Sequence, residues 1–184
     1  MVTIVFAHPW HGSFNAAILN TVITKLKKEN RAYQLIDLYQ DGFNPVMNEK
    51  ELALFRKGQS PYPLTIKYQG LLKNTDEAIF IFPIWWSSSP AILKGFFDKV
   101  MLKGFAYEYR NNELKPLLNI LKTTVITTSE SPTLKFKTSF EDVLIPHLFG
   151  GAGLKNVVWL NNEHTTNGTD QQRKEFLKTV EARV

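Results

Sequence analysis

Two adjacent indoles, Trp85 and Trp86, are the side chains in this sequence best suited to contact a flat aromatic ring. They follow an apolar run, residues 78–82, that predicts a buried strand, and they precede Pro90, where an amphipathic pattern predicts a helix. Loops after the strands of a parallel sheet lie at the edge where such sheets bind ligands. The alternative is that both indoles are core residues, because aromatic side chains bury large areas.

A second loop with chemical potential follows the first predicted strand, residues 2–7. Ser13 is a favourable N-cap for a helix predicted over residues 14–29, and the first amides of a helix favour phosphate. His8 could add a hydrogen-bond donor, although the loop has neither G-x-G-x-x-G nor a P-loop pattern. A helix cap beside a satisfied histidine is the alternative. His8 and His11 have no carboxylate nearby in sequence, so we expect no metal site.

A third loop of this kind ends the predicted strand at residues 122–128. Its short polar side chains and amides could meet the polar edge of a ring, and its residues are Thr127, Thr128, Ser129 and Glu130. An ordinary surface loop is an equally good interpretation of this segment.

The elements that must position these loops alternate between strand and helix. Strands are predicted at residues 2–7, 32–38, 78–82, 122–128 and 156–160, and helices at 14–29, 64–72, 90–102, 139–149 and 169–182. The alternation predicts one α/β domain over residues 1–184, a doubly wound parallel sheet with helices on both faces. We expect the flavodoxin-like strand order 2-1-3-4-5, which brings the loops after strands one, three and four to one edge.

Composition excludes several other classes of protein. The chain of 184 residues is 43% hydrophobic, enough for a substantial core, and it has no cysteine for disulfides, thiol catalysis or metal ligation. Its net charge of +5 attracts anions, but no nucleic-acid-binding motif accompanies the charge. No apolar run has membrane-spanning length and no signal peptide is evident, so we expect a cytoplasmic protein that is not embedded in a membrane.

Four segments in one order carry a resemblance to a known family. They are A-H-x-x-x-x-S-F-N at residues 7–15, D-L-Y…F-N-P at 37–45, F-P-x-x-W…P-A-I-L-K-G at 82–95 and a G-x-A-Y element at 104–107. Together they resemble the NAD(P)H:quinone oxidoreductase family, the DT-diaphorase-like flavodoxin-fold quinone reductases, including the small bacterial members.

The resemblance implies a flavin, NAD(P)H as cosubstrate and a homodimer with two shared sites. FMN is expected, with FAD as the alternative, because the chain lacks the longer C-terminal region of the FAD-dependent relatives. The resemblance assigns the flavin phosphate to His8, Ser13, Phe14 and Asn15, the flavin ring to Pro83, Ile84, Trp85 and Trp86, and the partner subunit's substrate pocket to Tyr107 and Tyr109.

One departure from the family pattern concerns the third loop. Relatives have T-T-G-G after the fourth strand, followed by a tyrosine and a histidine beside the flavin, whereas Ser129 and Glu130 stand in place of the two glycines. No matching tyrosine or histidine is found, so no catalytic residue is assigned. A Glu130 carboxylate aimed at the flavin would oppose its negative charge and lower its potential; a solvent-facing glutamate is the alternative.

The predicted function is flavin-dependent, ping-pong, two-electron transfer from NAD(P)H to a quinone or similar flat acceptor. A flavin-binding regulatory subunit with weak turnover, docked to a membrane transport system for potassium efflux, is one alternative. A one-electron flavodoxin-type carrier is the other.

Overall fold

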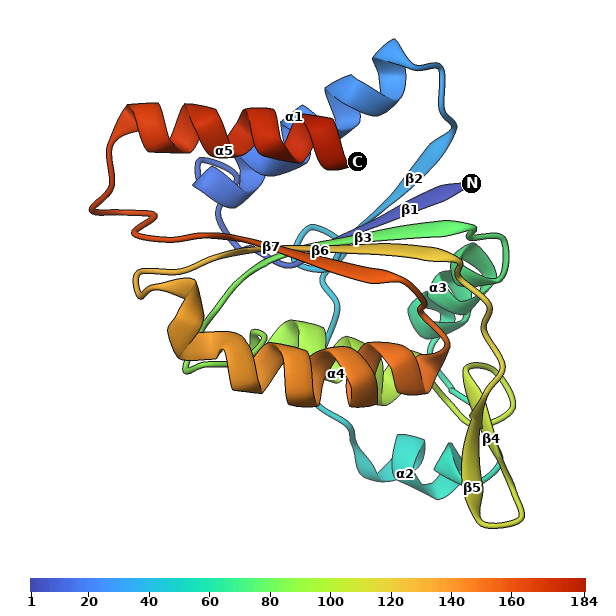
Figure 1. The fold of residues 1–184 in the computed structure, drawn as a ribbon. Coiled ribbons are helices and arrows are strands. Elements are labelled where there is room, and N and C mark those ends of the chain that lie inside the picture. Colours follow the sequence, from blue (N-terminus) through green and yellow to red (C-terminus); the bar gives the residue numbers. More distant parts are fainter.

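The structure is a computed structural model that describes residues 1–184, and it places a parallel sheet between two layers of helices (Figure 1). The sheet has the order β2-β1-β3-β6-β7 and all its neighbours are parallel. Because β4 and β5 form a separate hairpin, this is the predicted order 2-1-3-4-5, and the flavodoxin-like fold class is confirmed. The sheet strands are β1 (Val2–Phe6), β2 (Tyr33–Asp37), β3 (Glu77–Pro83), β6 (Lys122–Thr128) and β7 (Val157–Asn162).

Helices cover both faces of the sheet, and each face has its own apolar core. The helices α1 (Phe14–Lys28) and α5 (Asp170–Arg183) pack on the face where β1 presents alternate residues Val2, Ile4 and Phe6. The opposite face packs against α3 (Pro63–Lys73), α4 (Ala91–Val100) and η2 (Thr138–Phe149). Alternation along a strand gives each helical layer its own apolar surface.

The helix predicted over residues 139–149 is present but has an unexpected form. It is the π-helix η2, and it continues through Pro146 rather than ending there. The short 3-10 helices η1 (Thr133–Phe136) and η3 (Gly150–Ala152) flank it.

A hairpin that the sequence analysis did not predict protrudes from the core. Its strands are β4 (Tyr107–Arg110) and β5 (Glu113–Pro116), and it lies at the end of the molecule opposite the carboxyl ends of the sheet strands (Figure 1). Asn111 and Asn112 join the strands with φ angles of 53° and 63°. Asparagine tolerates this left-handed conformation, so the pair was a turn signal that could have been recognised.

A close contact joins two of the sequence motifs, D-L-Y…F-N-P at residues 37–45 and F-P-x-x-W…P-A-I-L-K-G at residues 82–95. A Cβ atom on Gly95 of α4 would lie 2.4 Å from Pro45, so only glycine lets the segment around Pro45 pack there. The same segment is held by the buried Lys99, whose Nζ donates to the Asn44 carbonyl at 2.7 Å. Lys99 also pairs at 3.0 Å with Glu51, the buried capping-box residue of α2 (Glu49–Phe55).

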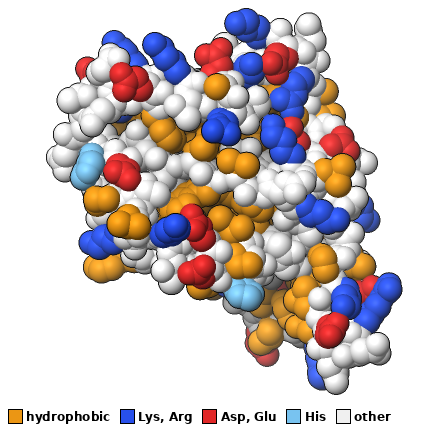
Figure 2. All heavy atoms as spheres, in the orientation of Figure 1, with side chains coloured by type: hydrophobic (Ala, Val, Ile, Leu, Met, Phe, Trp, Pro, Cys, Tyr) orange, Lys and Arg blue, Asp and Glu red, His pale blue; other side chains and the backbone are white.

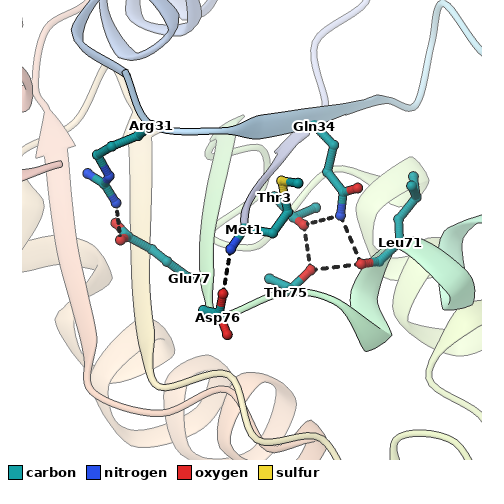
Figure 3. Close-up of polar contacts among 8 residues, drawn as sticks. All are labelled: Met1, Thr3, Arg31, Gln34, Leu71, Thr75, Asp76 and Glu77. Carbon is teal, nitrogen blue, oxygen red and sulfur yellow. Dashed lines mark hydrogen bonds and ion pairs between the residues drawn. The ribbon is translucent and has the colours of Figure 1, made fainter. Parts of the chain in front are cut away.

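Polar contacts tie together the amino ends of the strands, away from the edge described below (Figure 3). The Met1 ammonium pairs with Asp76, and Arg31 pairs with Glu77 at the start of β3. Gln34 donates to the Thr3 hydroxyl at 2.7 Å. These contacts fix the register of β1, β2 and β3 at the end of the sheet remote from the loops.

Charged side chains of both signs are mixed on the face drawn in Figure 2, with no extended block of Lys and Arg. This distribution agrees with the scatter of basic residues along the sequence. No helix combines the length and apolarity needed to cross a bilayer.

Candidate functional site

A pocket of about 670 Å³ lies where β1, β3 and β6 end, and all three suspected loops line it. This is the edge at which open α/β sheets bind ligands, and the volume suits a small molecule. Its wall includes ten of the residues predicted for the cofactor: His8, Ser13, Phe14, Asn15, Pro83, Ile84, Trp85, Thr128, Ser129 and Glu130.

The loop from β1 to α1 presents the amino end of a helix to this pocket. Ser13 is the N-cap of α1, and its Oγ accepts a hydrogen bond from the Ala16 amide at 3.2 Å. The first amides of α1 have no acceptor within the helix and carry its partial positive charge. This end of the pocket is therefore suited to an anionic group such as a phosphate.

His8 adds a titratable group to the same loop. Nδ1 lies 3.1 Å from the Trp10 amide, from which it accepts in one tautomer, and 3.2 Å from the Trp10 carbonyl, to which it donates in the other. Burial is the main cause that lowers the pKa of His8; the nearby His11 lowers it further, and a hydrogen bond with the Trp10 carbonyl opposes the shift. The lowered pKa favours the neutral ring, which has one N–H donor and one acceptor nitrogen.

Asn15 leaves a polar atom without a partner beside the pocket. The residue is buried, and its Nδ2 donates to Thr128 Oγ1 at 2.8 Å, which joins α1 to the end of β6. Its Oδ1 is buried and has no hydrogen-bond partner. Buried carbonyl oxygens are rarely left unpaired, so this atom is one that a ligand donor would satisfy.

The loop after β3 forms one side of the pocket. The Ile84 amide donates to the Thr128 carbonyl at 2.8 Å, which holds the loop against β6. The Trp85 ring centroid lies 6.3 Å from that of His8, so the indole and the β1 loop face the same space. Trp86 does not line this pocket: its side chain is fully exposed, with a relative exposure of 101%.

A strained turn explains the exposure of Trp86. Trp85 and Ser88 exchange two backbone hydrogen bonds of 3.1 Å, and the two residues between them, Trp86 and Ser87, have φ angles of 50° and 59°. Non-glycine residues pay for this left-handed conformation, by about 1–2 kcal/mol each. Such strain is common at ligand sites, and here it holds an indole outside the core.

The loop after β6 is locked to the loop after β7. The Thr165 amide donates to the Ser129 carbonyl at 3.0 Å. Glu130 Oε1 accepts from the Thr166 amide at 2.7 Å and from the Thr166 hydroxyl, and Oε2 accepts from Asn167 at 3.2 Å. Slight burial would raise the pKa of Glu130, but the hydrogen bonds from Thr166 and Asn167 outweigh it and lower that pKa. The carboxylate thus holds two loops together, and its effect on a flavin stays a prediction.

The other predicted residues lie elsewhere. Thr127 is buried beneath the pocket, where its Oγ1 accepts from Trp159 Nε1 and donates to Asn161 Oδ1, both at 2.8 Å. Tyr107 and Tyr109 belong to the distant hairpin and do not line the pocket of their own chain. Their assignment to a partner's pocket stays a prediction.

Several lining residues were not predicted from the sequence. Thr165 and Thr166 follow β7, whose carboxyl end meets the same edge, so the rule used for the other loops could have found them. Arg173 reaches the pocket from α5 and donates to the Thr165 and Gly168 carbonyls at 2.9 Å. No local pattern marked it. No group of three or more His, Asp or Glu side chains is arranged to hold a metal ion.

The pocket as a whole suits a ligand with an anionic end and a flat ring. The amino end of α1 and His8 match the anion, the unpaired Asn15 oxygen matches a hydroxyl or amide donor, and Trp85 offers an apolar face. A flavin nucleotide has each of these parts.

Fold and pocket define a flavodoxin-like α/β protein with a ligand-sized pocket at the carboxyl edge of its sheet. Residues 1–184 match the family described by its flavodoxin-like fold, and the chain belongs to that family.

The chain is also similar to proteins named for NAD(P)H chemistry. It is 35% identical over 161 residues to an uncharacterized NAD(P)H oxidoreductase of Haemophilus influenzae, covering 84% of this chain and 79% of that one. It is 33% identical to NAD(P)H dehydrogenase [quinone] 1 of Rattus norvegicus, covering 71% of this chain but only about half, 54%, of the rat protein. The structure of an NAD(P)H:quinone oxidoreductase from Methanothermobacter marburgensis superposes with a TM-score of 0.89 at 28% identity, covering 98% and 95% of the two chains.

Proposed function

We propose that this protein is a flavin-dependent NAD(P)H:quinone oxidoreductase. Its relatives support NAD(P)H-dependent oxidoreduction, and quinone reductases among them support a quinone as acceptor. The observation that best supports flavin binding is the composition of the pocket. The amino end of α1, the unpaired buried oxygen of Asn15 and the Trp85 indole all border one ligand-sized space.

The residues present would hold a flavin by its two ends. The amides at the start of α1, with Ser13 and His8, would bind the phosphate, and Trp85 with Ile84 would lie against the ring. When bound, the flavin supplies a hydride acceptor for NAD(P)H and a two-electron donor for a quinone or other flat acceptor, in ping-pong order. FMN and FAD share these contacts, and FMN is the form proposed.

The chain's own contribution is placement and electrostatics. The locked loops after β6 and β7 present fixed Thr128, Ser129 and Thr165 groups, which need not reorganise when a ligand binds. Orientation of this kind raises the effective concentration of the reacting groups. No side chain in the pocket is assigned a catalytic proton transfer.

A homodimer with shared sites is part of the proposal. Tyr107 and Tyr109 are on the β4–β5 hairpin and do not line the pocket of their own chain, so a role in substrate binding there requires a second copy. The cytoplasm is the proposed location.

Steady-state kinetics tests the proposed function. Flavin-loaded protein should oxidise NADH or NADPH with a soluble quinone, and double-reciprocal plots at several quinone concentrations should be parallel, as ping-pong transfer requires. A yellow protein without turnover would contradict the proposal in favour of a regulatory flavin-binding subunit. Transfer of single electrons only would favour a flavodoxin-type carrier.

A further inference from the structure

His11 differs from its neighbours in the loop from β1 to α1. Trp10 and Gly12, on either side of it, line the proposed flavin pocket, whereas His11 does not. Its ring lies instead beside the last residue pair of β1 and β2, which is Phe6 and Asp37. The ring centroids of His11 and Phe6 are 5.9 Å apart, and Nε2 of His11 lies 3.4 Å from Oδ2 of Asp37. This side chain therefore connects the loop to the end of β2.

The Asp37 carboxylate has one oxygen with a hydrogen-bond partner and one without. The side chain is only 4% exposed, and its Oδ1 accepts from the Gln40 amide at 3.1 Å. Its Oδ2 is buried and has no hydrogen-bond partner. A buried carboxylate is destabilising unless a donor or a cation compensates it. The imidazole of His11 is in position to be that cation.

The strength of this contact depends on the protonation of His11. A separation of 3.4 Å is longer than an ordinary N–H···O hydrogen bond, so the contact relies on charge. A neutral imidazole has its N–H on Nε2 in only one tautomer, whereas the protonated ring has an N–H on both nitrogens and a positive charge. Histidine side chains change charge between about pH 5 and pH 8. The pair should therefore be stronger at pH 6 than at pH 8.

Other titratable groups near the pair are neutral or already engaged. Burial lowers the pKa of His8 on the same loop and so favours its neutral ring. Asp41, in the turn after β2, accepts a hydrogen bond from the Tyr68 hydroxyl at 2.8 Å and lies 3.9 Å from Nζ of Lys67. The first turn of α1 has no acidic residue. Asp37 is thus the carboxylate that pairs with His11.

We propose that His11 and Asp37 position the loop from β1 to α1 for the flavin phosphate, and that they do so most strongly when His11 is protonated. The proposal rests on the proposed function, because it takes FMN as the ligand of this loop. The Ser13 amide donates to the Trp10 carbonyl at 3.1 Å, so a movement of the His11 segment would also displace the N-cap of α1. A loop already fixed to β2 loses less freedom when the phosphate binds, and binding is tighter for that reason. His11 is a positioning residue that does not contact the flavin.

Calorimetry at pH 6 and at pH 8 tests this role by titrating FMN into the full-length, flavin-free protein. Variants are compared with the native protein at the same pH, so the titration of the FMN phosphate cancels. At pH 6, His11→Gln should bind FMN about threefold more weakly, the size of a half-exposed ion pair, and at pH 8 the difference should nearly disappear. His11→Lys keeps a cation at both pH values, so it should bind FMN more tightly than His11→Gln at both.

Two controls separate positioning from other effects. Riboflavin lacks the phosphate, so its affinity should be the same in His11→Gln and in the native protein. His147→Gln changes an exposed histidine on η2, across the sheet and outside the pocket, and should bind FMN like the native protein at both pH values. Thermal unfolding without flavin shows whether each variant is folded.

Asp37→Asn tests the pairing itself. In this background His11→Gln should no longer weaken FMN binding at pH 6, because the charge that His11 pairs with is absent. A loss that persists there, an equal loss at both pH values, or an equal loss in His11→Lys and His11→Gln would overturn the proposal. The comparison of His11→Lys with His11→Gln does not require Asp37→Asn to fold. Failure of the native protein to bind FMN at either pH would instead refute the proposed function.

Discussion

Among single residues, Asn15 is the most informative side chain in the proposed flavin pocket. It joins α1 to β6 through Thr128 and keeps its Oδ1 unpaired in a buried position. Replacing it with alanine removes the atom that a ligand donor would satisfy. We expect Asn15→Ala to weaken flavin binding about tenfold, the effect of losing roughly one buried hydrogen bond.

Calorimetry with FMN and FAD measures that loss. Asn20→Ala, an exposed position on the same helix, is the matched control and should bind flavin like the native protein. Thermal unfolding without flavin separates a binding defect from a folding defect. Native affinity in Asn15→Ala would remove Asn15 from the site.

Glu130 gives a prediction about pH. Hydrogen bonds from Thr166 and Asn167 outweigh the effect of burial and lower its pKa in the folded state. The carboxylate therefore stabilises the fold at pH values above 4.5, the ordinary pKa of the group. That contribution is lost as the pH falls through the lowered pKa. The native protein should therefore be more stable than Glu130→Gln between pH 6 and 8, and the difference should shrink below pH 4.5. A difference that does not change with pH would contradict the role of the charged group.

The same variant tests whether Glu130 influences the flavin. The prediction from sequence is that its negative charge lowers the flavin potential, so Glu130→Gln should raise it. An unchanged flavin potential would show that Glu130 has no electrostatic effect on the flavin, and its role would then be the structural contacts with the loop after β7.

At the scale of elements, the turn after β3 carries strain that a single change can relieve. Glycine at position 87 can adopt the same left-handed conformation without the steric cost of about 1–2 kcal/mol that a residue with a side chain has. Glycine loses more backbone entropy on folding, which offsets about 0.5–1 kcal/mol of that gain. We expect Ser87→Gly to raise the free energy of unfolding by about 0.5–1 kcal/mol in urea titrations. Ser88→Gly, next along the turn and outside the left-handed region, should give no gain. Equal effects would exclude strain as the cause.

The buried pair of Lys99 and Glu51 connects α4 to α2. With side-chain exposures of 4% and 6%, neither charge can be solvated if its partner is removed. Lys99→Met should destabilise the fold by about 3–5 kcal/mol, and Lys99→Met/Glu51→Met should recover much of the loss. Chemical denaturation of both variants measures this, and a double variant no more stable than the single one would contradict a charge-based explanation.

Sequence patterns predicted the sheet and most helices because apolar periodicity, caps and β-branched runs act locally. The N-cap at Ser13 is an example, and it is present at the start of α1. The hairpin escaped notice because each of its strands has only four residues and β5 is exposed throughout, so neither forms an apolar run. The sequence could not predict that Arg173 lines the pocket or that Thr127 is buried. Both positions depend on packing between elements distant in sequence, which no local pattern encodes.

At the scale of the whole molecule, the two proposed halves of a substrate site lie at opposite ends of one chain. A shared-site dimer would bring the pocket of one copy to Tyr109 of the other. If so, Asn15→Ala and Tyr109→Ala should each reduce turnover. Mixing the two unfolded variants and refolding them together should restore activity in part, because each mixed dimer contains one intact site. No recovery, or a monomer in sedimentation, would contradict the shared-site arrangement.

The most direct test of the central claim is a crystal structure of the protein grown with excess FMN. The account predicts the flavin phosphate at the amino end of α1 beside Ser13, and the ring against Trp85 where β1, β3 and β6 end. A pocket that stays closed to FMN and FAD, or a flavin bound elsewhere on the protein, would contradict it.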